Sequence, residues 1–180
     1  MIKTADEAPP GDLWVFGYGS LMWKPGFVHV ECVPGRLDGW HRAPCVLSHV
    51  HRGTPERPGV VLGLDAEGSC EGLAFRVPEA GRVKVLTYLR EREQVTMVYR
   101  ERVLPVALSD GRQVEAVTYV VDRTHAQYAR ALPLAELIGR IVGARGRSGE
   151  NPDYFRETAA KLLELGIRDD LVERIANRLS

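Results

Sequence analysis

The chain has 180 residues, of which 44% are hydrophobic and 27% charged, so it is long enough for one core and leaves little room for a second domain. This composition disfavours a collagen-like, coiled-coil or disordered protein. Lysine and arginine number 24, as do aspartate and glutamate, so the formal net charge is zero. Because nucleic-acid binding depends on a positive field, we expect no nucleic-acid partner.

No apolar run approaches the roughly 18 residues that span a bilayer, and Asp6 and Glu7 stand where a signal peptide would be apolar. The three cysteines, Cys32, Cys45 and Cys70, are widely spaced and form no CxxC pair. We expect reduced thiols that belong neither to a disulfide scaffold nor to a zinc site. The sequence thus predicts a cytoplasmic protein with no membrane partner.

Residues 1–12 are polar, contain two prolines and a glycine, and show no periodicity, so we expect a flexible N-terminal lead followed by a single domain over residues 13–180. Short apolar and β-branched runs bounded by turn residues predict strands. These runs lie at residues 13–16, 43–48, 60–64, 70–77, 103–108 and 114–121. Asp110-Gly111 between the last two predicts a hairpin, because this pair tolerates the positive φ of a tight turn.

A 3.6-residue periodicity predicts helices over residues 80–93, 135–144, 153–165 and 169–179. Val83, Leu86 and Leu89 are expected to form the apolar stripe of the first helix, Asn151 to cap the third and Gly166 to end it. Strands come first and helices last, without regular βαβ alternation. This order predicts an α+β fold with a mostly antiparallel sheet or barrel, flanking helices and a helical C-terminal third.

A glycine-bearing segment, Phe16 to Pro25, directly follows the first predicted strand. Two glycines around Tyr18 allow successive N–H groups to point into one concavity, which is typical of anion and oxyanion sites. Met22 stands where a Rossmann motif needs a third glycine, Pro25 opposes a helix so soon after the strand, and the Gly-Lys-Ser/Thr of a P-loop is missing. The alternative to an anion site is a tight β-turn that holds an aromatic side chain.

Helical spacing places Glu93 on the same stripe as Leu86 and Leu89, facing the core. Burial of a carboxylate costs several kcal/mol unless the group is paired, and it raises the pKa toward the range of a general base. Glu93 is therefore a candidate catalytic base. The alternative is a structural glutamate at a helix end, paired with Arg90 or Arg82.

The polar loop over residues 49–59 is too rich in glycine and proline for regular structure. Its cations, His49, His51 and Arg52, together with the Thr54 hydroxyl, form a set that can hold a carboxylate. The two histidines can share a face as metal ligands do, but no third ligand stands at a suitable spacing. We therefore expect no metal site, and a solvated loop remains the alternative.

Several segments, in this order and spacing, resemble the ChaC-like γ-glutamylcyclotransferases, over a stretch that runs from about Leu13 to the C-terminal helices. The main ones are Val15 to Phe27, His51-Arg52-Gly53-Thr54-Pro55 and Tyr88-Leu89-Arg90-Glu91-Arg92-Glu93. Shorter ones are Gly72-Leu73-Ala74-Phe75, Asn151-Pro152-Asp153-Tyr154 and Gly166-Ile167-Arg168-Asp169.

The resemblance implies a small, barrel-like α+β fold and an enzyme that cleaves glutathione into 5-oxoproline and cysteinylglycine without a cofactor. It makes Glu93 the general base. It places the substrate against Phe16, Gly17, Tyr18, Gly19, Ser20 and Leu21, with Arg52 and Tyr99 as further binding residues. Arg90, where many relatives carry an acid, and residues 95–98, which replace a glycine pair, depart from the family pattern and affect which peptide is preferred. We expect a monomer or weak dimer whose partner is this small molecule.

This chemistry agrees with the residues themselves. In a γ-glutamyl amide the substrate's own α-amine can attack its γ-carbonyl, so a buried carboxylate and a set of N–H donors suffice without a Ser, Cys or metal nucleophile. One alternative is the same reaction on other γ-glutamyl amines or peptides. Another is a non-catalytic accessory or sensor protein for a cation transporter, which would not need an ionisable group at position 93.

Overall fold

The computed structural model describes residues 3–180, and the chain divides into two compact units. One unit contains the residues up to Arg42 together with Leu64–Asp122, and the other contains Ala43–Gly63 with Arg123–Ser180. Each unit draws on two separated segments because two long strands run from one unit into the other. The single domain expected over residues 13–180 stays a prediction.

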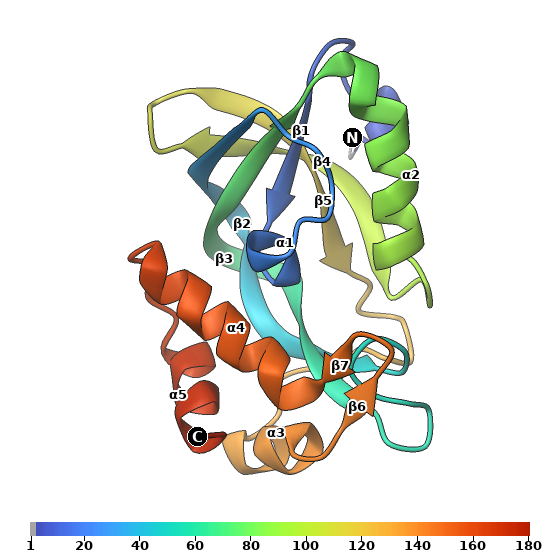
Figure 1. Ribbon diagram of the computed structural model, residues 1–180, viewed down its shortest axis with the longest axis vertical. Helices are drawn as coiled ribbons and strands as arrows, with labels where there is room; N and C mark the ends of the chain where they lie inside the picture. Colours follow the sequence, from blue (N-terminus) through green and yellow to red (C-terminus); the bar gives the residue numbers. More distant parts are fainter. Residues whose placement is uncertain (1–2) are drawn as a thin grey trace. The chain divides into compact units, whose positions relative to one another are not determined.

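Five strands form a closed barrel in the order β1-β3-β2-β4-β5 (Figure 1). The strands are β1 (Leu13–Gly17), β2 (Glu31–Ser48), β3 (Gly59–Val77), β4 (Tyr99–Leu108) and β5 (Gln113–Val121). The pairs β1–β3, β2–β4 and β4–β5 are antiparallel, whereas β5 runs parallel to β1 and β3 where it meets them. The predicted α+β class with a mostly antiparallel barrel is confirmed. The strands β6 (Arg145–Gly146) and β7 (Gly149–Glu150) pair with each other in a separate two-stranded antiparallel sheet.

The predicted strands 60–64 and 70–77 are parts of one long strand, β3. Glu67 and Gly68, with φ of 78° and 80°, bend this strand at the polar residues that the sequence analysis treats as a boundary. The predicted hairpin is confirmed: Ala107 pairs with Gln113, and Gly111 has a φ of 91°.

The helix α2 (Arg82–Glu93) follows a 3-10 turn, η2 (Glu79–Gly81), and confirms the predicted helix over residues 80–93. Leu86 and Leu89 are buried as expected, but Val83 is 77% exposed and does not belong to the stripe. The helix turns by about 100° per residue, which places Val83 roughly 100° from the centre of the buried face. Val85 is buried on that face instead.

The N-terminal segment over residues 3–12 contains a 3-10 turn, η1 (Ala5–Glu7), and contacts the barrel. The Val103 N–H donates to the Lys3 carbonyl at 2.8 Å, and Ala5 is fully buried. Arg82 donates from α2 to the Pro9 carbonyl at 2.7 Å. These partners lie 73 and 100 positions away in the sequence, so no local pattern reveals them. The flexible lead expected over residues 1–12 stays a prediction, and residues 1–2 lie outside the described part.

The second unit carries α3 (Leu134–Ile141), α4 (Asn151–Glu164) and α5 (Asp170–Arg178), which confirms the helical C-terminal third. Gly166, with a φ of 68°, follows the end of α4 as predicted. Glu150, not Asn151, occupies the N-cap position of α4. The buried Asn151 side chain instead accepts from the Val60 N–H at 2.8 Å and donates to the Val60 carbonyl at 2.7 Å. Over residues 3–180, no helix has the length and hydropathy needed to cross a membrane.

Candidate active site

The glycine-bearing segment leaves β1 at Gly17 and continues into a single helical turn, α1 (Ser20–Trp23), which ends before Pro25. Gly19 has φ −133° and ψ −125°, so it does not adopt the left-handed conformation that glycine permits. The segment is closely packed: a Cβ at Gly72 would overlap the Gly17 carbonyl oxygen and lie 2.9 Å from the Phe16 ring. Gly72 is therefore required for the close approach of β3 to β1.

Tyr18 is buried, and hydrogen bonds hold it at both ends. Its hydroxyl donates to the Tyr119 main-chain oxygen at 2.9 Å, and its main-chain oxygen accepts from Arg42 Nε at 2.6 Å. The Thr118 hydroxyl donates to the Phe16 carbonyl at 3.0 Å. Because hydrogen bonds with β5 and from Arg42 of β2 hold Phe16 and Tyr18, the conformation of the segment depends on distant residues as well as on its own sequence.

Glu93 is the last residue of α2, and its side chain is only 15% exposed. The predicted inward orientation is confirmed. Burial raises the pKa of this carboxyl, and the Arg92 cation, with Nε 3.6 Å from Oε1, partly opposes the shift. The alternative of a pair with Arg90 or Arg82 is not what the structure shows, since Arg90 binds Glu101 and Arg82 binds N-terminal carbonyls.

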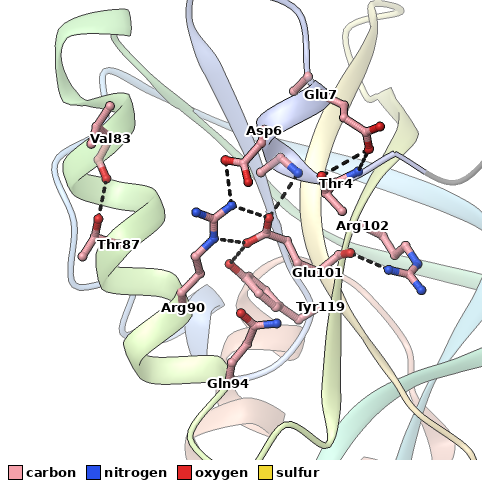
Figure 2. A network of polar contacts seen from close by, with 12 residues as sticks. Thr4, Asp6, Glu7, Val83, Thr87, Arg90, Gln94, Glu101, Arg102 and Tyr119 are labelled. Carbon is pink, nitrogen blue, oxygen red and sulfur yellow. Dashed lines mark hydrogen bonds and ion pairs between the residues drawn. The ribbon is translucent and has the colours of Figure 1, made fainter.

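A buried polar cluster lies on the barrel wall beside α2 (Figure 2). Arg90 donates to both carboxylate oxygens of Glu101, which is 7% exposed, and the Ala5 N–H and Tyr119 hydroxyl donate to the same carboxylate at 3.1 Å and 3.0 Å. Burial raises the pKa of Glu101, but these hydrogen bonds outweigh it and leave the pKa lowered. The Arg90 cation also binds Asp6 at 3.0 Å.

The charge of Glu93 is felt in this cluster at the Tyr119 phenol. Burial raises the pKa of the Tyr119 phenol, and the charges of Glu101 and Glu93 raise it further, so the phenol stays protonated. The sequence analysis missed Tyr119, although a tyrosine inside the apolar β5 run is a signal that its hydroxyl needs a buried partner. The same hydroxyl donates to Glu101, as Figure 2 shows.

Arg92 connects the glycine-bearing segment to the end of α2. Its Nη2 donates to the Ser20 hydroxyl at 2.9 Å, while its Nε lies 3.6 Å from Glu93. The structure therefore brings Ser20 and Glu93, predicted separately from two motifs, to the same guanidinium group. Tyr99 begins β4 in the same unit, is buried, and accepts a long hydrogen bond of 3.5 Å from Gln94 at its carbonyl.

Arg52 belongs to the other unit. It is buried there, donates to the Glu150 carbonyl at 2.9 Å and lies over the Tyr154 ring, 5.6 Å from its centroid. Nearby, His51 lies 2.9 Å from the Ser148 hydroxyl. This loop is thus bound to the β6–β7 region rather than solvated throughout, and the role of Arg52 toward substrate stays a prediction.

Within residues 3–180, no three His, Cys, Asp or Glu side chains are arranged to hold a metal ion. Cys45 and Cys70 are buried and Cys32 is exposed, and none of these three described residues forms a disulfide.

The fold matches solved structures of one class of enzyme. The crystal structure of the selenomethionine-labelled, glutathione-specific γ-glutamyl cyclotransferase from yeast superposes with a TM-score of 0.85 at 21% identity, over 94% of this chain and 96% of that one. At 21% sequence identity, this similarity supports a shared fold and nothing further.

The sequence comparison defines the family. The model of the ChaC-like protein family matches residues 13–180, and the chain belongs to this family. A glutathione-specific γ-glutamylcyclotransferase of Escherichia coli K12 is 39% identical over 168 residues, which cover 92% of this chain and 70% of the relative. The enzyme of the same name from Schizosaccharomyces pombe is 32% identical over 177 residues, covering 88% of this chain and 86% of the relative.

Proposed function

We propose that this protein is a glutathione-specific γ-glutamylcyclotransferase that converts glutathione into 5-oxoproline and cysteinylglycine. Membership of the ChaC-like family and the names of the E. coli and S. pombe relatives support the reaction and substrate. The observation that carries the proposal is the buried Glu93 carboxylate, which shares the Arg92 guanidinium with Ser20 of the glycine-bearing segment.

In the proposed reaction Glu93 takes a proton from the substrate's α-ammonium group. The freed amine attacks the γ-carbonyl carbon, a carbon–nitrogen bond forms and the carbonyl oxygen becomes an oxyanion. Collapse of this intermediate re-forms the carbonyl and breaks the bond to the cysteine nitrogen, which receives the proton held by Glu93. The regenerated Glu93 carboxylate then passes the second proton of the ring nitrogen to the same leaving nitrogen, so the products are 5-oxoproline, whose ring amide is neutral, and cysteinylglycine with a protonated amine. Atoms and charge balance without a cofactor or an external nucleophile.

The environment of Glu93 suits this task. An ordinary glutamate is too weak a base for an ammonium ion, and burial raises the pKa of Glu93 toward the working pH. A buried carboxylate whose ion pair with Arg92 is as long as 3.6 Å also costs stability, and such a cost is typical of functional groups. A non-catalytic sensor would not need it, so Glu93 favours the enzyme.

We further propose that the substrate's γ-glutamyl group lies against Phe16, Gly17, Tyr18, Gly19, Ser20 and Leu21, with main-chain N–H groups of this segment stabilising the oxyanion. Tyr99 and Arg52 are proposed as further contacts to the substrate. The hydrogen bonds that fix Tyr18 support a preformed surface, because a site that need not reorganise stabilises developing charge better.

A cytoplasmic location and a monomeric or weakly dimeric state belong to the same proposal. The balanced charge of 24 basic and 24 acidic residues agrees with a protein that acts on a small molecule rather than on nucleic acid. Light scattering after size-exclusion chromatography measures the oligomeric state.

The decisive experiment is an assay of 5-oxoproline release from a panel of γ-glutamyl compounds. We expect turnover with glutathione and much slower turnover with γ-glutamyl amines and γ-glutamyl dipeptides. Faster release from those compounds would assign the same chemistry to another substrate. Tight binding without release from any compound would support the sensor instead.

A further inference from the structure

The side chain of Arg92 extends from α2 into the segment that follows β1. Its Nη2 donates to the Ser20 hydroxyl at 2.9 Å, and its Nη1 donates to the main-chain oxygens of Lys24 and Pro25 at 2.6 Å and 3.1 Å. The side chain is only 16% exposed. One guanidinium group therefore holds both the start of α1 and the chain just beyond its end.

Arg92 is itself held from its own helix. Its Nη1 donates to the Tyr88 hydroxyl at 2.8 Å, one turn earlier in α2. Gly26, with a φ of 76°, lies so close to Tyr88 that a Cβ there would overlap the hydroxyl. The segment after α1 thus also packs on the residue that orients Arg92.

The chemistry of this arrangement requires arginine. Five N–H donors in a rigid planar fork can reach a hydroxyl and two carbonyls at once, whereas a lysine ammonium is a compact donor on a flexible stem. The acceptors from Ser20, Lys24 and Pro25 are neutral, so they do not cancel the positive charge. That charge remains available to the nearby Glu93 carboxylate at 3.6 Å.

We propose that Arg92 is a positioning residue for the cyclisation, which fixes the substrate-holding segment around Ser20 relative to the Glu93 carboxylate. This inference rests on the proposed function, in which Glu93 is the base and the segment holds the γ-glutamyl group. Cyclisation needs the amine, the γ-carbonyl and the base in one geometry, and a displacement of about 1 Å can lower the rate 10²-fold. A single guanidinium group that contacts both the segment around Ser20 and the Glu93 carboxylate fixes the distance between them.

Arg92 also affects the ionisation of Glu93. Burial raises the pKa of Glu93, and the Arg92 cation is the charge that lowers it. The Tyr119 phenol of β5 is neutral, with a raised pKa to which the charge of Glu93 contributes, and the charges of Arg90 and Glu101 are paired with each other. Loss of the Arg92 charge would therefore raise the pKa of Glu93 further and leave less of the base form at a given pH.

Two substitutions separate geometry from charge. Arg92→Lys keeps the positive charge but removes the planar set of N–H donors. We therefore expect kcat to fall about 10²-fold, while the acidic limb of the dependence of kcat/KM on pH stays at the same pH. Arg92→Met removes both the charge and the guanidinium donors, so we expect a similar or larger fall in kcat and an acidic limb shifted to higher pH.

The matched control is Arg82→Met, because Arg82 lies on the same helix and also donates to main-chain carbonyls, but those of the N-terminal segment. It should lower the melting temperature and leave both kcat and the limb unchanged.

Wild-type kcat in a folded Arg92→Lys would overturn the positioning role, and an unshifted acidic limb in Arg92→Met would overturn the effect of the Arg92 charge on Glu93. If Arg92→Met does not fold, Tyr88→Phe tests the same contact by removing one acceptor with little change of shape. It should lower kcat several-fold while KM changes by less than about 2-fold, and an unchanged kcat would count against the proposal. Failure of the proposed function would be seen separately, as retained turnover in Glu93→Gln, and would overturn this inference too.

Discussion

Arg90 and Glu101 form a two-pronged ion pair between α2 and β4, with Nε and Nη2 of the arginine 2.9 Å and 2.8 Å from the two carboxylate oxygens. Glu101 is 7% exposed and also accepts from the Ala5 N–H and the Tyr119 hydroxyl, whereas Arg90 is 36% exposed. This pair holds the N-terminal segment, the helix that ends in Glu93 and the barrel wall together.

Replacement of Arg90 by methionine should destabilise the protein by about 2–3 kcal/mol, because Glu101 would lose its cation inside the protein. The effect is below the 3–5 kcal/mol of a fully buried pair since Arg90 is partly solvated. Denaturant unfolding measures it. Arg140→Met is the control, because the Arg140–Glu136 pair is exposed and should contribute less than about 0.5 kcal/mol. Equal losses in the two variants would contradict a structural role for the Arg90–Glu101 pair.

Glu93→Gln should lower kcat by about 10²–10⁴-fold, because the amide has nearly the same shape but cannot accept the ammonium proton. The fold and the binding of glutathione should persist, as measured by thermal melting and by calorimetry. Glu91→Gln, at an exposed position of the same helix, is the matched control and should retain wild-type turnover. Substantial turnover in Glu93→Gln would exclude Glu93 as the base.

The raised pKa of Glu93 also predicts the pH dependence of stability. In the pH interval above the ordinary value of 4.5 and below the raised folded value, the native state binds more protons than the unfolded state, so this group makes stability fall as pH rises. Glu93→Gln removes that loss. The variant should therefore unfold at higher denaturant than the wild type at neutral pH, with the difference shrinking as the pH falls toward 4.5. A variant less stable than the wild type at neutral pH would show that Glu93 is satisfied by its surroundings.

Gly72→Ala should destabilise the protein by about 1–3 kcal/mol and reduce turnover, since the added methyl group would displace the Gly17 carbonyl and the Phe16 ring. Gly139→Ala provides the control: Gly139 is exposed within α3 and has open space around its Cβ position, so alanine should stabilise that helix by about 0.5–1 kcal/mol. A Gly72→Ala variant with wild-type melting temperature and kinetics would show that the turn does not need this close approach.

Exhaustive chelation should leave the rate of 5-oxoproline release unchanged. The proposed nucleophile is the substrate's own amine, which needs no Lewis acid, and the described residues contain no suitable cluster of ligands. The assay compares dialysed enzyme with and without chelator and with added zinc or manganese. Activity that falls with chelator and returns with metal would direct attention back to His49 and His51.

The local features of this protein follow from its sequence. The Asp110-Gly111 pair predicts the β4–β5 hairpin because only a few residue types tolerate its turn geometry, and helical periodicity predicts α2 almost to the residue. The inward orientation of Glu93 follows from its spacing to Leu86 and Leu89. The resemblance to a family adds the reaction, since several short motifs in a fixed order indicate chemistry that no single one of them specifies.

The contacts between distant segments are decided only by the tertiary structure. No local pattern reveals that Arg92 donates a hydrogen bond to Ser20, 72 positions earlier in the chain. The same holds for the ion pair between Arg90 and Glu101 and for the hydrogen bond between Asn151 and the main chain at Val60. Long polar side chains have many rotamers and can reach acceptors in any direction, so their partners depend on which strands the barrel brings near. The position of Val83 on the exposed face depends likewise on which side of α2 meets the barrel. The sequence by itself thus determines the elements, the motifs and the candidate base, while the closed barrel determines which side chains hold that base and the substrate-binding segment in place.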